Sequence, residues 1–268
     1  MANTGYENFV LESRLTDLLN TKMDTRSFMT IDDSLEGVPG MKKTINVYTF
    51  TGQVEKLEKG SGNSDRGAVS FSKKDYKVEL EQQAFDYFDE EFMMDPNIVD
   101  MGLQGSAQLM INAANTKFFE ELAKASLEHQ YSDTLKYDDI VDAIALMKLE
   151  DESGLFLVIG TDLKAVIRKD AEFKSARQGE IIYNGQIGSI AGIPVVVSKI
   201  VEEGAAFITT KKAVTHFVKK KAEVAQERDE DKRKNSVYNR RVGLIALTDA
   251  TQVVKITSAE TYSAKKKK

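Results

Sequence analysis

The longest helical pattern in the sequence begins at Pro96 and runs to about Glu128 without another proline. Asp95 before it is a residue type that caps helices, and a proline suits the first helical turn. At ~1.5 Å per residue such a helix would be roughly 50 Å long. Its apolar side chains recur at helical spacing, which predicts a core-facing helix, with a partner-binding face as the alternative. The apolar positions are Leu103, Ala107, Met110, Ala114, Phe118, Leu122 and Ala125.

Upstream of this helix, two strand-like segments flank a long polar stretch. Lys43–Phe50 and Val69–Leu80 alternate apolar and polar residues, whereas Gly52–Gly67 has almost no residues suited to a core. The three segments together predict a hairpin with a polar, glycine-rich tip. Unstructured loops this long are usually functional or disordered. The tip is therefore either a mobile surface loop or an arm that pairs with another molecule.

Two further segments have helical periodicity. Residues 1–37 are mostly polar, but Phe9 and Leu15 belong to an apolar group that lies close to one helical face. An arm of this kind buries little of itself, so it must lie on its own subunit or on a partner. Gln82–Met94 predicts a second amphipathic helix.

The centre of the chain alternates helical and strand-like segments. Asp138 or Asp139 caps one predicted helix, and Thr161 or Asp162 caps another. Between them, Gly154–Gly160 is a short apolar run that predicts a buried central strand. A strand over Ala205–Thr209 follows further along. This order predicts an α+β fold in which helices pack on a sheet.

Three glycines in Asn184–Ser198 are spaced like those of a phosphate-binding loop. Such a loop needs a helix after its glycines, because the helix N-terminus binds the anion. Here Ile193–Val197 follows, and its proline and valines predict a strand. We therefore predict a hairpin turning at Asn184–Gly185, with Gly188 and Gly192 at bulges or close backbone approaches. A nucleotide site is excluded here.

The segment from Lys211 to Arg241 is dense in charges of both signs. Lys219–Lys221 and Lys232–Lys234 flank the mostly acidic run Glu227–Asp231. A nucleic-acid site would more often show one sign with interleaved aromatic residues. The pattern favours a solvated strand-and-loop surface or an ion-pairing contact face. After it, Val242–Thr248 and Val253–Ile256 predict a closing hairpin around residues 249–251.

Composition narrows the function classes. The 268 residues contain no cysteine, two histidines and a formal net charge of -5. Disulfides and thiolate metal sites are excluded, a reducing cytoplasm suits the chain, and no global attraction to nucleic acid is expected. No metal-ligand spacing and no nucleophile motif occurs, and no apolar run approaches the length of a membrane span. We expect no enzyme activity and no cofactor, although acids distant in sequence could still pair.

The order of these elements resembles one protein family. Tyr137–Ile144 looks like its first helix after the long helix, and Leu157–Arg168 like its strand-then-helix unit. Gly185–Ser198 looks like its glycine-rich hairpin, and Gly243–Asp249 like a closing strand. These segments resemble the major capsid proteins of tailed bacteriophages, which share the Hong Kong 97-like capsid fold with encapsulins. The resemblance covers nearly all of residues 42–256.

The resemblance implies a domain plan and a function. The function is a shell of hexamers and pentamers that encloses double-stranded phage DNA in the virion. An encapsulin shell is the alternative, and a small-molecule enzyme on the α+β domain is a third hypothesis from another class. The implied domains are an N-terminal arm (1–40), an extended loop or E-loop (41–82), a peripheral domain with the spine helix (83–137), an axial domain (138–210), and returning strands with a disordered lysine-rich tail (211–268).

The resemblance also implies partners and contacts. The short arm after Met1 resembles relatives served by a separate scaffolding protein, and a portal and a decoration protein are further expected partners. Packaged DNA would be bound only non-specifically, no membrane is expected, and assembly would occur in the host cytoplasm. The arm and the hairpin tip would reach neighbouring subunits. The candidate intersubunit contacts are Val54, Glu55, Lys56, Leu57, Glu58, Lys59, Arg66, Phe9, Leu15, Arg228 and Arg233.

Overall fold

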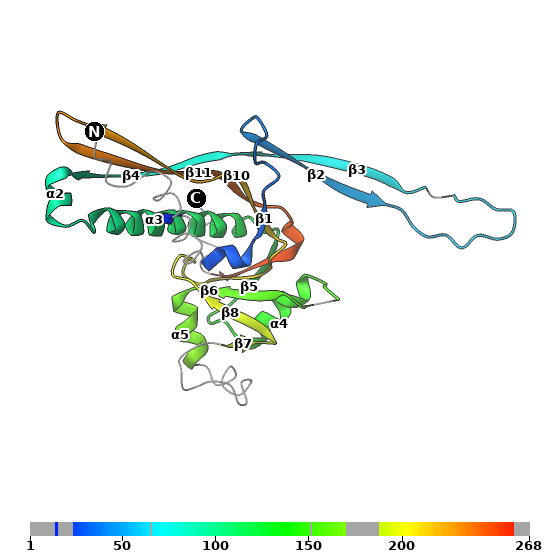
Figure 1. Cartoon of the computed structure of the whole chain (residues 1–268). Coiled ribbons are helices and arrows are strands. Elements are labelled where there is room, and N and C mark those ends of the chain that lie inside the picture. The colour runs from blue at the N-terminus through cyan, green and yellow to red at the C-terminus, as the bar shows by residue number, and fades with distance from the viewer. Residues whose placement is uncertain (1–13, 16–23, 65, 151, 170–187, 260–268) are drawn as a thin grey trace.

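The computed structural model describes residues 14–15, 24–64, 66–150, 152–169 and 188–259. Within these residues the strands form a four-stranded sheet, a six-stranded sheet and a two-stranded ribbon. One long helix runs beneath the four-stranded sheet, the six-stranded sheet lies on the other side of this helix, and the ribbon projects far from the body (Figure 1). The molecule is elongated, with the ribbon at one end and a short helix, α2, at the other.

The long helix is confirmed as α3, Ile98–Leu122. Its 25 residues correspond to roughly 37 Å. It begins two residues after Pro96. Just before this start, the Asp95 carboxylate accepts a hydrogen bond from the Asn97 amide at 2.9 Å. It ends earlier than predicted, because strand β5, Leu127–Tyr131, follows closely. The side chains buried along it are Val99, Leu103, Ser106, Ala107, Met110, Ile111, Ala114, Phe118, Phe119 and Leu122.

The four-stranded sheet covers one face of α3. Its order is β1-β10-β11-β4, with β1 at Thr30–Asp32, β10 at Val214–Asp229, β11 at Lys234–Leu247 and β4 at Glu79–Phe88. The long β10–β11 hairpin accounts for the charged segment of the sequence. Because β1 pairs with β10, the last part of the predicted N-terminal arm belongs to the body.

The predicted helix over Gln82–Met94 is wrong in its first half. Strand β4 runs to Phe88 and pairs with β11 over ten residues, and only Asp89–Met94 is helical, as α2. The burial along β4 alternates, with Phe85 and Tyr87 facing α3 and their neighbours exposed. Pairing with a long neighbouring strand therefore overrides the local helical periodicity.

The predicted closing hairpin is also wrong. β11 stays in the ladder with β10 as far as Leu247, whereas β12, Val253–Ser258, belongs to the six-stranded sheet. A short 3-10 helix, η2 at Ala250–Gln252, redirects the chain between the two sheets. Val253, Val254 and Ile256 are fully buried in the second sheet. Two apolar strands that look like a hairpin thus belong to two different sheets.

The six-stranded sheet forms the axial part of the molecule, in the order β5-β12-β9-β6-β8-β7. The predicted central strand is confirmed as β6, Leu155–Ile159, with all five residues buried. The predicted helices are confirmed as α4, Tyr137–Leu146, and α5, Thr161–Lys169. β5 and β12, which lie outside the predicted axial range 138–210, complete this sheet. The other strands are β7 at Ser189–Ile190, β8 at Ile193–Val197 and β9 at Ala205–Thr210.

The glycine-rich segment forms a hairpin of β7 and β8. Its turn is Ala191–Gly192, where φ is 51° and 80°. Two positive φ angles in succession fit a tight turn in which glycine is favoured. Gly192 is therefore a turn residue and not the predicted bulge or close backbone approach, because a Cβ atom there would meet nothing within 4 Å. The predicted turn at Asn184–Gly185 lies outside the described residues. The predicted strand after the glycines is confirmed as β8, and it stands where a phosphate-binding loop would need a helix.

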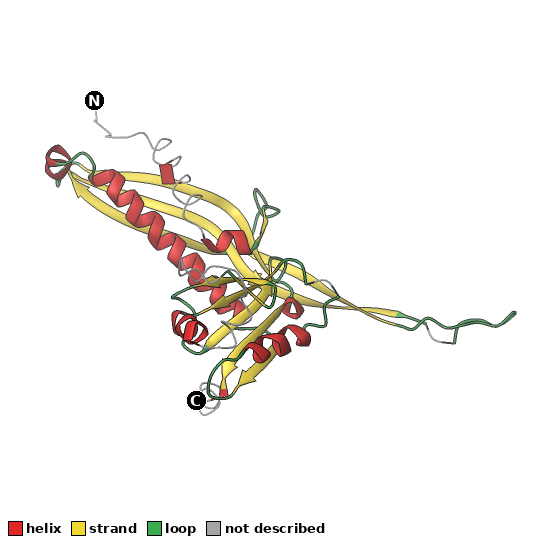
Figure 2. Ribbon diagram, turned by 90° about the horizontal axis from the view of Figure 1, so that it is seen from below, coloured by secondary structure: helices red, strands yellow, loops and turns green. Residues whose placement is uncertain are grey.

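The predicted two-stranded ribbon is confirmed. β2, Lys42–Thr51, pairs antiparallel with β3, Ala68–Lys77, from the Lys42–Lys77 pair at the base to the Thr51–Ala68 pair near the tip. Each strand pairs only with the other in the described part of the chain. Seen from below, the ribbon and its tip still extend well beyond the body (Figure 2). We call β2, β3 and the tip between them the arm.

Candidate intersubunit contact surfaces

The outer half of the arm carries an exposed apolar face. Phe50, Val69 and Phe71 expose between 59% and 69% of their surface. Phe50 and Val69 are cross-strand partners, and Phe71 lies two residues from Val69 on β3, so all three share one face of the ribbon. Large apolar side chains gathered on one exposed face mark an interaction surface. We call these three residues the arm stripe.

The tip of the arm contains seven of the predicted contact residues, Val54 to Lys59 and Arg66. Val54 is fully exposed, and Leu57, Lys56, Lys59 and Arg66 are also exposed. Residues 52–58 form no strand within this chain. The tip is instead shaped by local hydrogen bonds, which leave its basic and apolar side chains facing outward.

Two acidic residues of the tip, Glu55 and Glu58, accept four of these local hydrogen bonds. The Glu55 carboxylate accepts from the Ser64 amide at 2.8 Å and from the Ser64 hydroxyl at 2.5 Å. The Glu58 carbonyl accepts from the Ser61 amide at 3.1 Å and from the Ser61 hydroxyl at 2.7 Å. Glu55 therefore helps to fold the tip, and its carboxylate is less available to a neighbour than the predicted contact role assumed.

The opposite end of the molecule carries a second exposed apolar group. Met93 and Met94 at the end of α2 and Met101 in the first turn of α3 expose between 63% and 86% of their surface. Exposed acidic residues lie close to them in the sequence, namely Glu90, Glu91 and Asp95. Methionine is enriched at protein interfaces, because its unbranched side chain adapts to a partner surface. We call Met93, Met94 and Met101 the methionine end.

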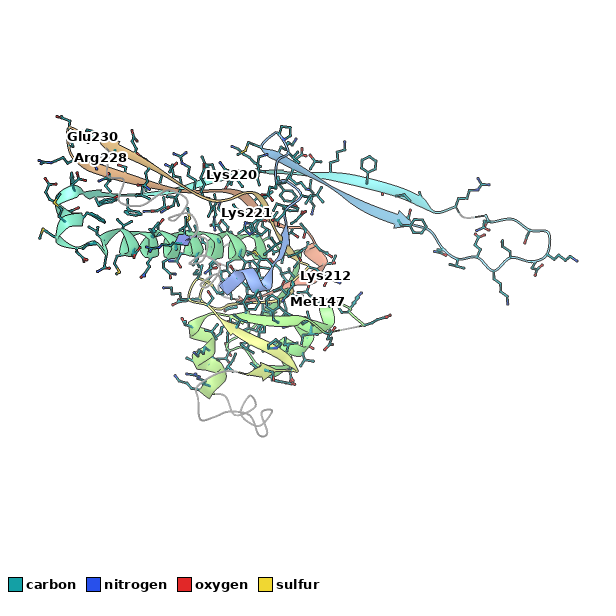
Figure 3. The ribbon with its side chains drawn as sticks, viewed as in Figure 1. Met147, Lys212, Lys220, Lys221, Arg228 and Glu230 are labelled. Atoms are coloured by element: carbon teal, nitrogen blue, oxygen red, sulfur yellow. The ribbon has the colours of Figure 1, made fainter. Side chains whose placement is uncertain are left out.

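Arg228 lies near the end of β10 (Figure 3), and Arg233 lies in the turn that joins β10 to β11. Arg228 pairs with Asp89 at 2.8 Å and with Glu230 at 2.9 Å, and Arg233 pairs with Glu90 at 2.9 Å. The hydrogen bond to Glu230, followed by the charge of Asp89, raises the pKa of Arg228. Both predicted contact residues therefore tie the hairpin to α2 within one subunit. Arg233 remains exposed, whereas Arg228 is largely covered.

The two predicted contacts in the N-terminal segment have different outcomes. Leu15 has no exposed surface and packs among Tyr87, Val99 and Leu103, at the start of α3. A fully buried side chain offers nothing to a neighbour, so Leu15 is a core residue of its own subunit. Phe9 lies outside the described residues.

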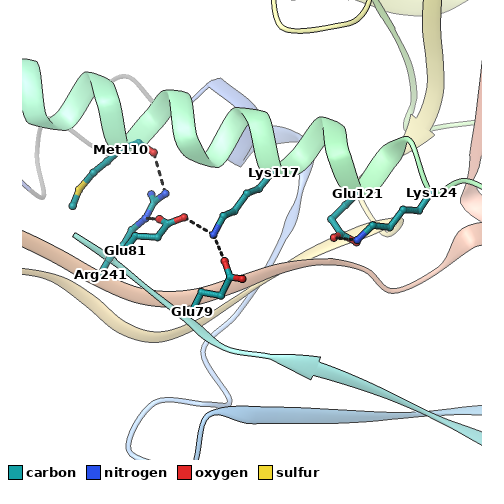
Figure 4. Close-up of polar contacts among 7 residues, drawn as sticks. All are labelled: Glu79, Glu81, Met110, Lys117, Glu121, Lys124 and Arg241. Atoms are coloured by element: carbon teal, nitrogen blue, oxygen red, sulfur yellow. Dashed lines mark hydrogen bonds and ion pairs between the residues drawn. The ribbon is translucent and has the colours of Figure 1, made fainter. Parts of the chain in front are cut away.

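A network of charged side chains fixes the spine helix to the sheet near the base of the arm (Figure 4). Lys117 of α3 binds Glu79 and Glu81 of β4, and Arg241 of β11 binds Glu81 and donates to the Met110 carbonyl at 2.9 Å. Burial by itself would raise the pKa of Glu81, but Arg241 and Lys117 lower it below the usual value. The network therefore favours the ionised carboxylate and holds the start of β4 in place.

The described residues contain no group of three or more His, Cys, Asp or Glu side chains arranged to hold a metal ion. His129 Nε2 lies 3.3 Å from Asp139 Oδ1. Asp139 also accepts from the Lys136 amide at the start of α4, which is a helix-capping role. None of the helices described is both long enough and apolar enough to cross a membrane.

The two apolar ends were missed as sites from sequence, although each leaves a signal there. Phe50, Val69 and Phe71 fit the alternation that predicts a strand, but no helix or second sheet was predicted to cover them. Met93 and Met94 follow three acidic residues in a short segment that was predicted to be amphipathic. In both places the signal is an apolar group without a predicted partner within the chain.

Comparisons with known proteins show the same architecture. No protein-family model matches the chain. A major capsid protein of Staphylococcus phage phiMR11 is 24% identical over 255 residues, which cover 92% of each chain.

Solved structures extend the comparison. The mature capsid of bacteriophage PhiM1 matches with a TM-score of 0.70 at 10% identity, over 87% of this chain and 86% of that one. The capsid of a native GTA particle matches with a TM-score of 0.71 at 10% identity, over 88% and 90%. A virus-like particle from Pyrococcus furiosus matches with a TM-score of 0.61 at 12% identity, over 92% and 98%. The chain therefore has the fold of these shell proteins, which is the Hong Kong 97-like capsid fold.

Proposed function

We propose that this chain is a phage major capsid protein that assembles as hexamers and pentamers into an icosahedral shell around double-stranded DNA. The near full-length match to the capsid protein of a Staphylococcus phage supports the class of function. The observation that carries the mechanism is the position of the arm stripe and the methionine end at opposite ends of one elongated subunit.

The two ends carry charges of opposite sign, in addition to their exposed apolar side chains. Lys73 is exposed and follows Phe71 on the same face of β3, and Lys74 is exposed beside it. Glu91 and Asp95, which flank Met93 and Met94 in the sequence, supply the opposite charge, whereas Glu90 is already paired with Arg233. A contact between two different surfaces is heterologous, and it closes into a ring when the rotation between subunits permits. Docking of the arm of one subunit on the methionine end of the next would generate such rings.

The tip residues from Val54 to Lys59, together with Arg66, would extend this contact onto a neighbour. Ordering a chain segment costs roughly 1–2 kcal/mol per residue in backbone entropy, and the exposed tip buries little within its own subunit to offset that cost. Apolar contacts of Val54 and Leu57, with ion pairs from Lys56, Lys59 and Arg66, would supply the compensation in the shell.

Further partners follow from the same function. A separate scaffolding protein would guide assembly in the host cytoplasm, a portal would occupy one vertex, and a decoration protein would bind the outer surface. With a net charge of -5, the subunit would bind packaged DNA only non-specifically. The mature protein would be located in the virion.

An encapsulin-type compartment is a second candidate. The match to the virus-like particle from Pyrococcus furiosus spans 98% of that chain, so the fold alone fits either kind of shell. The contents of the particle distinguish the two functions. A capsid protects DNA from nuclease when it is isolated from infected cells, whereas an encapsulin holds a cargo protein.

Electron microscopy of the protein, produced alone and together with the structural proteins of its phage, tests the proposal. We expect closed shells with hexameric and pentameric units, and nuclease-resistant DNA in particles from infected cells. A protein that stays monomeric at every concentration, with scaffold present, would disprove shell formation. Shells that hold only a cargo protein would establish the second candidate instead.

A further inference from the structure

The arm separates from the peripheral sheet at one defined point. The ladder between β4 and β11 ends at the Glu79–Gly243 pair, and the chain before Glu79 leads into the arm. β11 itself continues to Leu247 with only β10 beside it. The outer edge of β11 beyond Gly243 therefore has no strand partner in the described part of the chain. Its backbone groups must be satisfied in another way.

Two side chains from different elements bind the last peptide groups of this edge. The Tyr76 hydroxyl of β3 donates to the Leu247 carbonyl at 2.9 Å. The Leu247 amide donates to a carboxylate oxygen of Glu121, in the last turn of α3, at 3.2 Å. Burial, followed by the nearby Glu121, raises the pKa of Tyr76, so its hydroxyl stays protonated and able to donate. The arm and the spine helix thus meet at a single residue.

β2, the other strand of the arm, is also bound to the body, at the position opposite Tyr76. Lys43 of β2 is the cross-strand partner of Tyr76. Its ammonium donates to the Ser34 hydroxyl at 2.9 Å and lies 5.1 Å from the centre of the Phe217 ring. Beyond this pair, Ile45 adds apolar packing at the base, and the outer half of the ribbon is exposed. Apolar packing is non-directional, whereas hydrogen bonds fix an orientation.

We propose that the hydrogen bonds from Tyr76 to Leu247 and from Leu247 to Glu121 form a latch that sets the angle of the arm against the body and couples it to the end of α3. With the latch closed, the arm holds one orientation. With the Tyr76 bond broken, the arm pivots about the apolar contacts at its base. The latch is a property of the isolated subunit. Its consequence for shell curvature rests on the proposed function, because the arm angle would then set the angle between neighbours.

Distance measurements on unassembled subunits test the latch. The chain has no cysteine, so two introduced cysteines can be spin-labelled without interference. Lys73→Cys on β3 and Asp142→Cys on α4 place labels at exposed positions on the arm and on the axial part. Pulsed electron paramagnetic resonance then reports the arm angle as a distance distribution. We expect one narrow distribution for the labelled parent.

Tyr76→Phe removes the hydroxyl and keeps the ring. The lost bond should raise the fraction of molecules with a displaced arm by about 2- to 10-fold, seen as a broadened distribution. Tyr238→Phe is the matched control, because it removes a hydrogen bond of 3.0 Å from Tyr238 on β11 to Glu227 on β10, away from the arm. It should leave the distribution unchanged. Glu121→Ala should broaden the distribution, whereas Glu121→Gln keeps an acceptor oxygen and should not.

A Tyr76→Phe distribution identical to that of the parent would overturn the latch. A Glu121→Ala distribution identical to that of the parent would overturn the coupling to α3. Both readings are made on single subunits, so they stand whether or not the protein forms shells. Failure of shell formation with a working latch would count against the proposed function alone.

Discussion

At the scale of single residues, the polar contacts beneath the sheet are specific to the side chains present. Glu81 stands between Arg241 from β11 and Lys117 from α3, and these two cations lower its pKa against the effect of burial. A carboxyl with a lowered pKa in the folded state stabilises the protein above its unfolded pKa. That contribution is lost as the pH falls through the folded pKa.

Replacement of Glu81 tests this contribution. Glu81→Gln should lower the free energy of unfolding at pH 7 by about 1–2 kcal/mol, a value reduced for the partial exposure of the group. As the pH falls below the usual range of carboxyl pKa values, the parent should lose stability. The difference in unfolding free energy between parent and variant should then narrow. Urea unfolding of unassembled subunits at several pH values measures both effects. Glu120→Gln, at an exposed position on α3, is the control and should change little; a constant difference at every pH would contradict the assignment.

Two glycines of α3 predict opposite responses to the same substitution. A Cβ atom at Gly102 would lie 2.4 Å from the ring of Phe85, whereas a Cβ at Gly105 would meet nothing within 4 Å. Gly105→Ala should stabilise the protein by up to about 1 kcal/mol, because alanine is the better helix former. Gly102→Ala should destabilise it by about 1–3 kcal/mol through overpacking against β4. Urea unfolding of both variants measures the sign of each change in the free energy of unfolding. Changes of the same sign would show that the Phe85 ring moves aside freely.

At the scale of elements, the sequence predicts the helices and strands that are determined by local residue patterns. The spine helix, the buried strand β6, the two axial helices and the ribbon follow from periodicity and capping residues. Gln82–Phe88 was misread as helix because its alternation is weak and only the long β11 beside it makes it a strand.

The same limit applies to the contact residues. The packing that buries Leu15 and pairs Arg228 with Asp89 depends on elements far away in the chain.

The tip of the arm should be required for assembly and not for folding. Replacing residues 53–68 with a short Asn-Gly turn removes few apolar side chains, so little folding stability should be lost. Thermal unfolding of unassembled subunits should match the parent within about 2 °C. Sedimentation should show loss of the large assembled species. Shells at the parental yield would make the tip a surface decoration and contradict its role in contacts.

At the scale of the whole molecule, the separation of the two apolar ends predicts how defective subunits behave. Phe71→Asp would disable the arm stripe, and Met94→Asp would disable the methionine end. Each variant keeps the other surface intact. Alone, either variant should remain unassembled, because burying an unpaired carboxylate in an apolar contact is costly.

A mixture of the two variants distinguishes head-to-tail contacts from symmetric ones. The intact arm of the Met94→Asp subunit can bind the intact methionine end of the Phe71→Asp subunit, and the remaining surfaces of that pair are both disabled. Sedimentation of the mixture should therefore show pairs and no rings. Val141→Asp, at an exposed position on α4, is the control and should assemble like the parent. Rings from either variant alone would show that these surfaces are not the contact.

The arm also bears on how a growing assembly corrects its errors. Its tip is exposed and residues 52–58 form no strand within the subunit, so a free subunit gains little by keeping the tip ordered. Much of the binding energy of each new contact is then spent on ordering the tip, and the net strength of one contact stays modest. A subunit held by a single misplaced contact would dissociate quickly, whereas one held on several sides would remain. Weak single bonds would thus let the growing particle discard mistakes before it closes.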